Sequence, residues 1–225
     1  MTILHLVEKI RRNYKKDGVL SWFICFCAFV ANAIVWGIDS SAGVPFGSIM
    51  KYFNSSEANV AWIGSVHSST QYFSASLSSM LAERFGFAPV IAIGILISST
   101  FFAISTTSQN VSNLTLYYGF FAGFGLGLIY TPGGIICSFH FRERRSLATG
   151  ISMCGSGIGI ILVSEAMNFI NVYYGWKGCV ILCACMCPFI SLLAVIAYIL
   201  PENYEEPTVV VNENTKLYEP VEGCR

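Results

Sequence analysis

Residues 140–159 read H-F-R-E-R-R-S-L-A-T-G-I-S-M-C-G-S-G-I-G, a basic loop that turns into a helix rich in small residues. The loop carries three cations that cannot lie in hydrocarbon, namely Arg142, Arg144 and Arg145. No charged residue follows between residues 147 and 163, so a membrane surface passes close to Ser146. Because positive charge accumulates in cytoplasmic loops, we predict that this loop faces the cytoplasm.

Glycines mark one side of this helix. Gly150, Gly155 and Gly159 stand four or five residues apart, which puts them near one stripe. Helices in a membrane associate through such small residues, because a neighbouring backbone can then approach closely. The sequence therefore predicts that this helix packs against another through its glycines.

The whole chain is too apolar for a soluble domain. Of its 225 residues, 54% are hydrophobic and only 12% are charged. A membrane-spanning helix needs about 20 mainly apolar residues, and six stretches qualify: 19–44, 60–81, 89–108, 114–138, 147–170 and 178–200. We therefore predict an all-α membrane protein with six transmembrane helices. The first is a retained span rather than a signal peptide, because no small-residue cleavage site accompanies it.

Charge divides the chain into three parts and sets its orientation. Residues 1–16 form a basic segment, 17–200 the six-helix domain, and 201–225 an acidic tail that we predict to be disordered. All Lys and Arg except Lys51 and Lys177 fall on one side of the alternating spans, which places both termini in the cytoplasm. Candidate N-glycosylation sites fall in loops on the other side, at Asn54, Asn110 and Asn113.

Neither metal nor nucleotide chemistry is indicated. In the run Cys183, Cys185, Cys187, residues two apart point about 200° from each other on a helix and cannot bind one ion from one face. The glycines of the fourth span do not match G-x-G-x-x-G, and no strand precedes them. We therefore expect no cofactor, no metal and no nucleic-acid partner.

Three ionisable side chains fall inside the predicted spans: Asp39, His67 and Glu165. At about 1.5 Å of rise per residue, all three lie in the outer half of the membrane. A charge at that depth costs several kcal/mol unless it faces water or a partner. We therefore predict that Asp39 and His67 contact a transported solute or proton, on a route lined by the serine-rich second span. Glu165 is a candidate for the same role, with snorkelling to the outer interface as the alternative.

Two motifs match signatures of one known family. Where the basic loop enters the fifth span, the signature Y-F-x-x-x-R-x-x-A-x-G-x-x-x-A-G-x-x-x-G is matched by Phe141, Arg145, Ala148, Gly150, Gly155 and Gly159, with His140 for the Tyr and Cys154 for the Ala. At the first span, an acid, Gly, a small residue and Trp are matched by Asp17, Gly18, Ser21 and Trp22. The chain thus resembles the monocarboxylate transporter family of the major facilitator superfamily. A weaker superfamily motif, G-x-x-x-D-R-x-G, survives as Ser79, Glu83, Arg84 and Gly86.

The resemblance covers residues 17–200 and implies the amino-terminal half of a twelve-helix transporter. Such transporters hold a solute between two six-helix halves and expose it alternately to each side of the membrane. In the family, Arg145 would hold an inner gate by ion pairing, with Asp17 as the first candidate partner. A half of this kind implies a truncated isoform, an incomplete gene model, or a chain that pairs with a second copy, a full-length transporter or the missing half.

The family also implies a substrate, a membrane and a partner. The substrate would be a monocarboxylate or related small organic acid in the plasma membrane, with a single-span accessory glycoprotein as partner. The best-known members are proton symporters that carry a Lys late in the first helix. The corresponding position here is Ser40, beside Asp39, so the residues argue against lactate-type symport.

Two alternatives to transport stay open at this point. The chain can be a non-transporting half that binds and regulates a full-length transporter. It can also be an intramembrane protease, because Ser156 lies between two glycines, but no His on the sixth span is present to activate that serine. We expect a transporter and not an enzyme.

Overall fold

The computed structural model describes residues 18–141 and 144–190. Asp17, the basic segment 1–16, the end of the sixth span and the acidic tail 201–225 lie outside these residues. The described elements are α2 (Val19–Ser40), the 3-10 turn η1 (Ser41–Gly43), α3 (Phe46–Phe53), α4 (Glu57–Phe85), α5 (Phe87–Ser105), α6 (Val111–Leu114), the π-helix η2 (Thr115–Ala122), α7 (Gly123–His140), α8 (Arg145–Met186) and the 3-10 turn η3 (Cys187–Ile190).

Helix α8 consists of two legs that meet at a turn. Gly175 has φ 67° and ψ −166° inside it, a backbone conformation open essentially to glycine alone. The legs, residues 145–174 and 176–186, correspond to the fifth and sixth predicted spans. Because α6, η2 and α7 follow one another directly, they form the fourth. Together with α2, α4 and α5, the described chain has six legs, which confirms the predicted six-helix all-α fold.

Apolar composition does not extend to every leg. Among the described residues, the stretches long and apolar enough to cross a membrane are Ser21–Gly43, Phe87–Ser105, Val111–Thr131 and Arg145–Ile190, the last holding both legs of α8. Helix α4 has 29 residues but is absent from this set, because its many serines lower its hydropathy. Several of its polar side chains are buried against neighbouring helices, among them His67, Gln71, Ser74 and Ser78.

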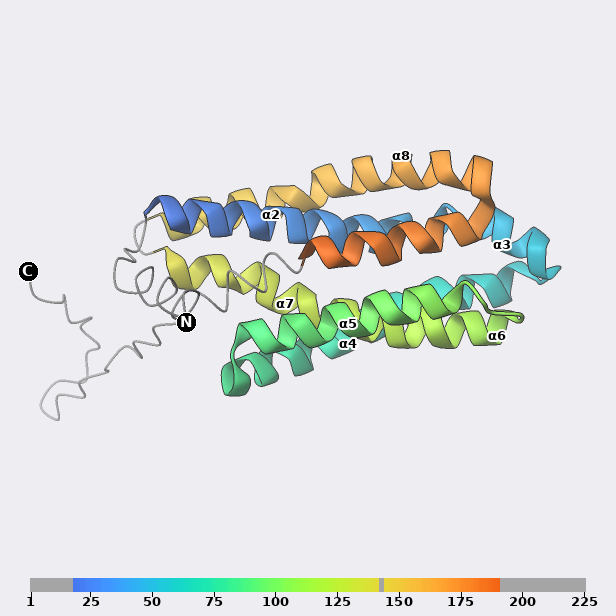
Figure 1. Ribbon diagram of the computed structural model, residues 1–225, viewed down its shortest axis with the longest axis horizontal. Helices are drawn as coiled ribbons and strands as arrows, with labels where there is room; N and C mark the ends of the chain where they lie inside the picture. Colours follow the sequence, from blue (N-terminus) through green and yellow to red (C-terminus); the bar gives the residue numbers. More distant parts are fainter. Residues whose placement is uncertain (1–17, 142–143, 191–225) are drawn as a thin grey trace, which may run out of the picture.

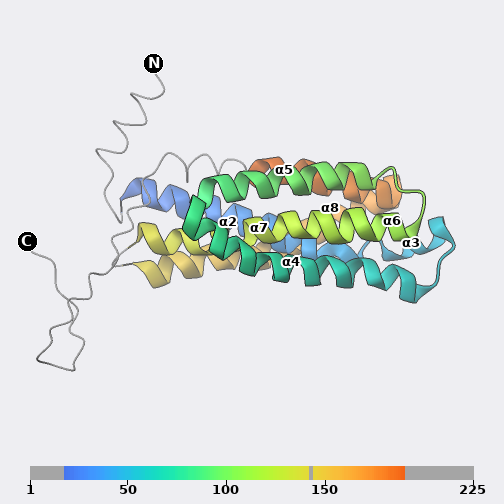
Figure 2. The ribbon, with the colours of Figure 1, turned by 90° about the horizontal axis from the view of Figure 1, so that it is seen from below.

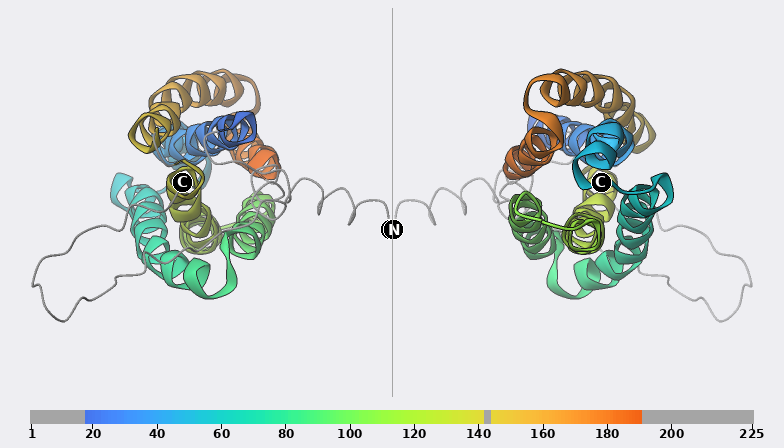
Figure 3. Two further views of the ribbon diagram at one scale, coloured as in Figure 1. Left: turned by 90° about the vertical axis from the view of Figure 1, so that its left-hand side faces the viewer. Right: turned by 90° about the vertical axis from the view of Figure 1, so that its right-hand side faces the viewer.

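The legs lie side by side and alternate in direction (Figure 1). Helix α2 packs against α8, α7 packs against α4 and α5, and α7 also contacts α2 and α8. Seen across and along the bundle, α2 and the legs of α8 form one layer and α4, α5 and α7 another (Figures 2 and 3). Helix α3 and the bend of α8 lie at one end, and the α4–α5 turn at the other. Which end faces the cytoplasm stays a prediction.

Helices α2 and α8 meet through glycines, as the sequence predicts for two of them. A methyl group placed on Gly155 would collide with the carbonyl oxygen of Phe29, and one on Gly159 with that of Ala33. Both glycines are buried. Their lack of a side chain therefore allows the two backbones to touch.

Gly150 does not belong to this contact, so that part of the prediction is wrong. It is exposed, and an added methyl group would meet nothing within 4 Å. Five residues at about 100° each leave it about 140° around the helix from Gly155, whereas Gly159 lies only about 40° away. A step of five residues leaves the contact face.

The glycines of the fourth span have a packing role that the sequence reading missed. Gly123 and Gly127 lie directly against the backbone of α4, and a methyl group on Gly125 would come 2.8 Å from the carbonyl oxygen of Gly94 in α5. This packing could have been predicted from the four-residue spacing of Gly119, Gly123 and Gly127, which places all three glycines on one face of the helix. Helix α7 can therefore lie between α4 and α5 at backbone distance.

Candidate functional site

Asp39 lies at the end of α2, and a hydrogen bond joins it to α4. Ser68 Oγ donates to Asp39 Oδ1 at 2.9 Å, and both residues are half-buried. The next residue, Ser40, is exposed. The structure therefore brings Asp39 into contact with one serine of the polar second span.

Further hydroxyl groups lie near this carboxylate. We call Asp39, Ser40, Ser65, Ser68 and Tyr72 the polar flank. All five are half-buried or exposed, and Tyr72 lies close enough to Asp39 to interact with it electrostatically. A carboxylate among hydroxyl groups on the surface of a bundle can bind a polar solute or exchange a proton. It cannot stay against lipid without a cost of several kcal/mol.

His67 is completely buried behind the polar flank. Its Nδ1 lies 3.1 Å from the carbonyl oxygen of Tyr118, and because a carbonyl only accepts, Nδ1 carries the hydrogen. Nε2 has no hydrogen-bond partner within the described chain. The imidazole lies 5.1 Å from the Tyr118 ring and 6.3 Å from the Phe102 ring, centroid to centroid. It is also near enough to Asp39 for an electrostatic interaction.

The partner of His67 belongs to an unusual segment. Tyr118 lies in η2, whose eight residues form a π-helix. Such segments are rare and frequently occur at functional sites. No sequence pattern predicts this π-helix.

Glu165 lies apart from this group. It is on the exposed side of α8, beside Ile161, Leu162 and Phe169, which are 64–66% exposed. The opposite side of the same helix is buried through Val163 and Met167. Glu165 and Asp39 are therefore not members of one cluster.

At the opposite end of the bundle, residues of the family signature hold α2 against α8. The rings of Trp22 and Phe141 meet edge to face, 5.2 Å apart. Ala148 is fully buried, and its carbonyl oxygen accepts a hydrogen bond from Cys25 Sγ at 3.3 Å. Arg145 is exposed, and its predicted partner lies outside the described residues. Trp22 therefore braces the start of α2 against the loop before α8.

The charged pair of the weaker superfamily motif lies at the surface, whereas Ser21 of the first-span motif is completely buried. Glu83 and Arg84 are exposed, and the Arg84 guanidinium lies 5.8 Å from the centre of the Phe85 ring. The three sequon asparagines, Asn54, Asn110 and Asn113, are exposed as well. Their glycosylation stays a prediction.

The structure offers no support for a protease or a metal centre in the part of the chain that it describes. Ser156 Oγ donates to the Met153 carbonyl at 2.7 Å, while His67 is committed to Tyr118 elsewhere. Cys183 and Cys187 are buried and Cys185 is exposed, as residues on opposite helix faces must be. No group of three or more His, Cys, Asp or Glu side chains among the described residues could hold a metal ion.

A comparison with family models places this geometry among known membrane proteins. The model described as Major Facilitator Superfamily matches residues 21–219. A solved structure of the peptide transporter POT in complex with alafosfalin superimposes with a TM-score of 0.65 at 18% identity, over 84% of this chain and 41% of that one. At this identity the likeness concerns the fold alone.

Curated relatives carry the name that the sequence motifs suggested. Monocarboxylate transporter 11 of Homo sapiens is 30% identical over 166 residues, which is 74% of this chain and 35% of the relative. Monocarboxylate transporter 13 of Rattus norvegicus is 28% identical over 201 residues, 89% of this chain and 46% of the relative. The chain thus spans less than half the length of these relatives.

Proposed function

This chain belongs to the Major Facilitator Superfamily, and on that premise we propose that it carries small organic solutes across a membrane by alternating access. The observation that supports this most is the Asp39–Ser68 hydrogen bond. It joins α2 to α4 within an exposed strip of hydroxyl groups. A route for a polar solute needs such a strip, whereas a purely structural helix pair in lipid does not.

The proposed solute is a monocarboxylate or a related small acid, in keeping with the names of the relatives. Because Ser40 stands where a cation would receive the carboxylate, the positive charge would come from the unit that faces the polar flank. Asp39 and His67 would carry coupled protons. The imidazole suits that role because Nε2 has no hydrogen-bond partner in the described chain, so its lone pair can accept a proton.

The proposed inner gate combines Arg145 with Asp17, and in the sequence these two residues lie close to Phe141 and Trp22, whose rings are in contact. Alternating access requires each six-helix unit to move as a body. The glycine contact between α2 and α8 would serve this by making the unit stiff. The gate then opens by separating Arg145 from its partner without repacking α2.

We further propose that a second six-helix unit covers the polar flank. That unit would be a second copy of this chain, a full-length transporter or a carboxy-terminal half, in the plasma membrane, with both termini cytoplasmic and a single-span glycoprotein as accessory partner. The support is physical, since Asp39 and its hydroxyl neighbours are costly against lipid.

Uptake into proteoliposomes tests the transport proposal. The chain is reconstituted alone and with a full-length relative, and entry of radiolabelled short monocarboxylates is measured with an inward proton gradient. We expect uptake by the parent, a loss of at least about tenfold for Asp39→Asn, and near-parent uptake for Glu165→Gln, which lies outside the polar flank. Equal uptake by Asp39→Asn and the parent would remove Asp39 from the mechanism.

The alternative is a non-transporting half that regulates a full-length transporter. Glu165 favours it, because a carboxylate among exposed apolar residues of α8 needs a cationic partner in the membrane. If the chain alone shows no uptake but changes the uptake of the co-reconstituted relative, and Glu165→Gln abolishes that change, this second function holds.

A further inference from the structure

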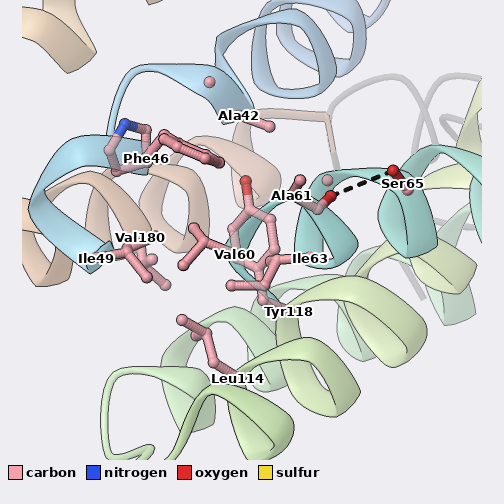
Figure 4. A pocket seen from close by; sticks show the side chains of 13 residues that line it. Ala42, Phe46, Ile49, Val60, Ala61, Ile63, Ser65, Leu114, Tyr118 and Val180 are labelled. Atoms are coloured by element: carbon pink, nitrogen blue, oxygen red, sulfur yellow. Dashed lines mark hydrogen bonds between the residues drawn. The ribbon is translucent and has the colours of Figure 1, made fainter. Parts of the chain in front are cut away.

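A cavity of about 300 Å³ opens inside the six-helix unit, at the end where α3 lies. Its walls come from the α2–η1–α3 connection, the start of α4, the α6–η2 segment and the second leg of α8 (Figure 4). All of these elements belong to the one unit. The cavity is therefore complete within one unit, whereas the solute route needs a second one, and the two adjoin at Ser65, which lines the cavity and belongs to the polar flank.

The walls of the cavity are almost entirely apolar. They include Ile49, Val60 and Val180, and none of the lining residues is charged. The polar side chains among them are Ser65 and Tyr118, and Ser65 Oγ already donates to the Ala61 carbonyl at 3.2 Å. An anion would lose more hydration here than these two groups could replace. The walls thus favour an uncharged molecule.

Tyr118 supplies one free polar group to this space. Its side chain is 94% buried, because only 6% is exposed, and its ring extends from the η2 segment into the cavity (Figure 4). The Tyr118 hydroxyl is not among the buried side-chain atoms without a partner, so its oxygen is accessible from the cavity. A Tyr hydroxyl in a largely apolar site can donate one hydrogen bond to a bound molecule. A ligand with one acceptor, such as a carbonyl oxygen, would accept it.

Two glycines keep the cavity open. Gly43 and Gly64 both line it, and a methyl group added to either would meet no atom within 4 Å. Gly43, Ala61 and Ser65 are exposed, so they form its mouth beside the polar flank. An apolar cavity of about 150 Å³ can already take up a benzene molecule, so this one has room for a larger ring system.

We propose that this cavity is a binding site for an uncharged, largely apolar organic molecule that carries one hydrogen-bond acceptor for the Tyr118 hydroxyl. A bound ligand would restrain the Tyr118 ring. The backbone carbonyl of the same residue accepts the hydrogen bond from His67. The site goes beyond the proposed transport function, because it is complete within this chain and its ligand is not the transported acid.

Photolabelling with benzophenone tests the site, because that probe is apolar, uncharged and carries one carbonyl. The purified chain in nanodiscs is irradiated with the probe, and labelled peptides are mapped by mass spectrometry. Labels should gather on residues 42–49 and 60–65. We expect Gly64→Leu, which fills the cavity, to lower this labelling at least about fivefold, and Gly150→Leu, at an exposed open glycine outside the cavity, to leave it unchanged. Gly43→Ala repeats the test with a smaller change if Gly64→Leu does not fold.

Three further arms define the ligand class. Charged 4-benzoylbenzoate should not label the cavity, and equal labelling would overturn the uncharged class. Tyr118→Phe should weaken benzophenone binding about tenfold, as one lost hydrogen bond implies, while diphenylmethane, which lacks the carbonyl, should compete equally in both forms. Phospholipid with a photoreactive acyl chain should label the outer surface and not residues 60–65. Labelling there by the acyl chain, or benzophenone labelling that Gly64→Leu does not reduce, would refute the proposal.

Discussion

Asn32 shows how one polar residue can join two helices inside an apolar span. Its Nδ2 donates to Ser152 Oγ at 2.9 Å and lies 3.3 Å from the Ser152 carbonyl oxygen. Both side chains are buried. In lipid the alternative for Asn32 is an unsatisfied amide, which is costly. This pair therefore selects the rotation at which α2 faces α8.

The coupling between Asn32 and Ser152 is measurable. In a double-mutant cycle of Asn32→Leu and Ser152→Ala, we expect a coupling free energy of about 1 kcal/mol, which is the usual size for hydrogen bonds between membrane helices. Reversible unfolding in mixed micelles gives the four stabilities. Strictly additive effects would mean that the two side chains do not interact in solution.

Sequence reasoning reached some of these residues and not others. Asp39 and His67 could be singled out because an ionisable group in a span is costly wherever it lies. Ser68 could not be distinguished from the other serines of α4, because its contact depends on how α4 is rotated about its axis. The partner of Asn32 lies 120 positions away, and no local pattern predicts it.

At the scale of helices, glycine register governs how closely α2 and α8 pack. We expect Gly155→Leu to lower the folded yield several-fold, because the new side chain would occupy the position of the Phe29 carbonyl. Gly150→Leu, on the same helix but in open space, is the matched control and should fold like the parent. Size-exclusion profiles in detergent compare the two. Equal yields would show that this contact does not determine folding.

A second prediction concerns the stability of the turn within α8. Gly175 has φ 67° and ψ −166°, a backbone conformation that an alanine adopts only at a cost of about 1–3 kcal/mol. We therefore expect Gly175→Ala to lower the stability of the fold by about this amount. Gly157→Ala, at an exposed helical glycine of the same element, should instead be neutral or stabilise by up to about 1 kcal/mol. Thermal unfolding of both variants checks the sign of each change. Stabilisation by Gly175→Ala would contradict the sharp turn between the legs.

Helix boundaries followed from the sequence more readily than helix faces. The six predicted spans correspond to six legs, because stretch length and apolar content are local properties. The face on which a residue lies depends on the rotation summed along the helix. A single five-residue step from Gly150 to Gly155 was therefore enough to make the predicted face of Gly150 wrong. The cavity beside Tyr118 was not predicted, because four segments that lie far apart in the sequence must meet to form it.

For the molecule as a whole, the alternating legs predict a definite topology. In a cysteine-depleted background, Asn54→Cys should react with an impermeant maleimide added outside cells, and Arg84→Cys only after permeabilisation. Both positions are exposed. Asn54 lies just before the start of α4, and Arg84 lies in its last turn. The expectation follows from the excess of Lys and Arg at one end. The reverse labelling pattern would invert the orientation.

The central claim is that the polar flank around Asp39 is one wall of a solute route that a second six-helix unit completes, and in the purified chain that unit can only be a second copy. The most direct measurement is the mass of the purified chain in nanodiscs after oxidative crosslinking of Ser40→Cys, in a cysteine-depleted background. Ser40 is exposed beside Asp39, so a covering unit must pass close to it. We predict a crosslinked species of twice the chain mass of 24.7 kDa, in which the introduced thiol no longer reacts with maleimide. A monomer of single mass whose thiol reacts freely would contradict the claim.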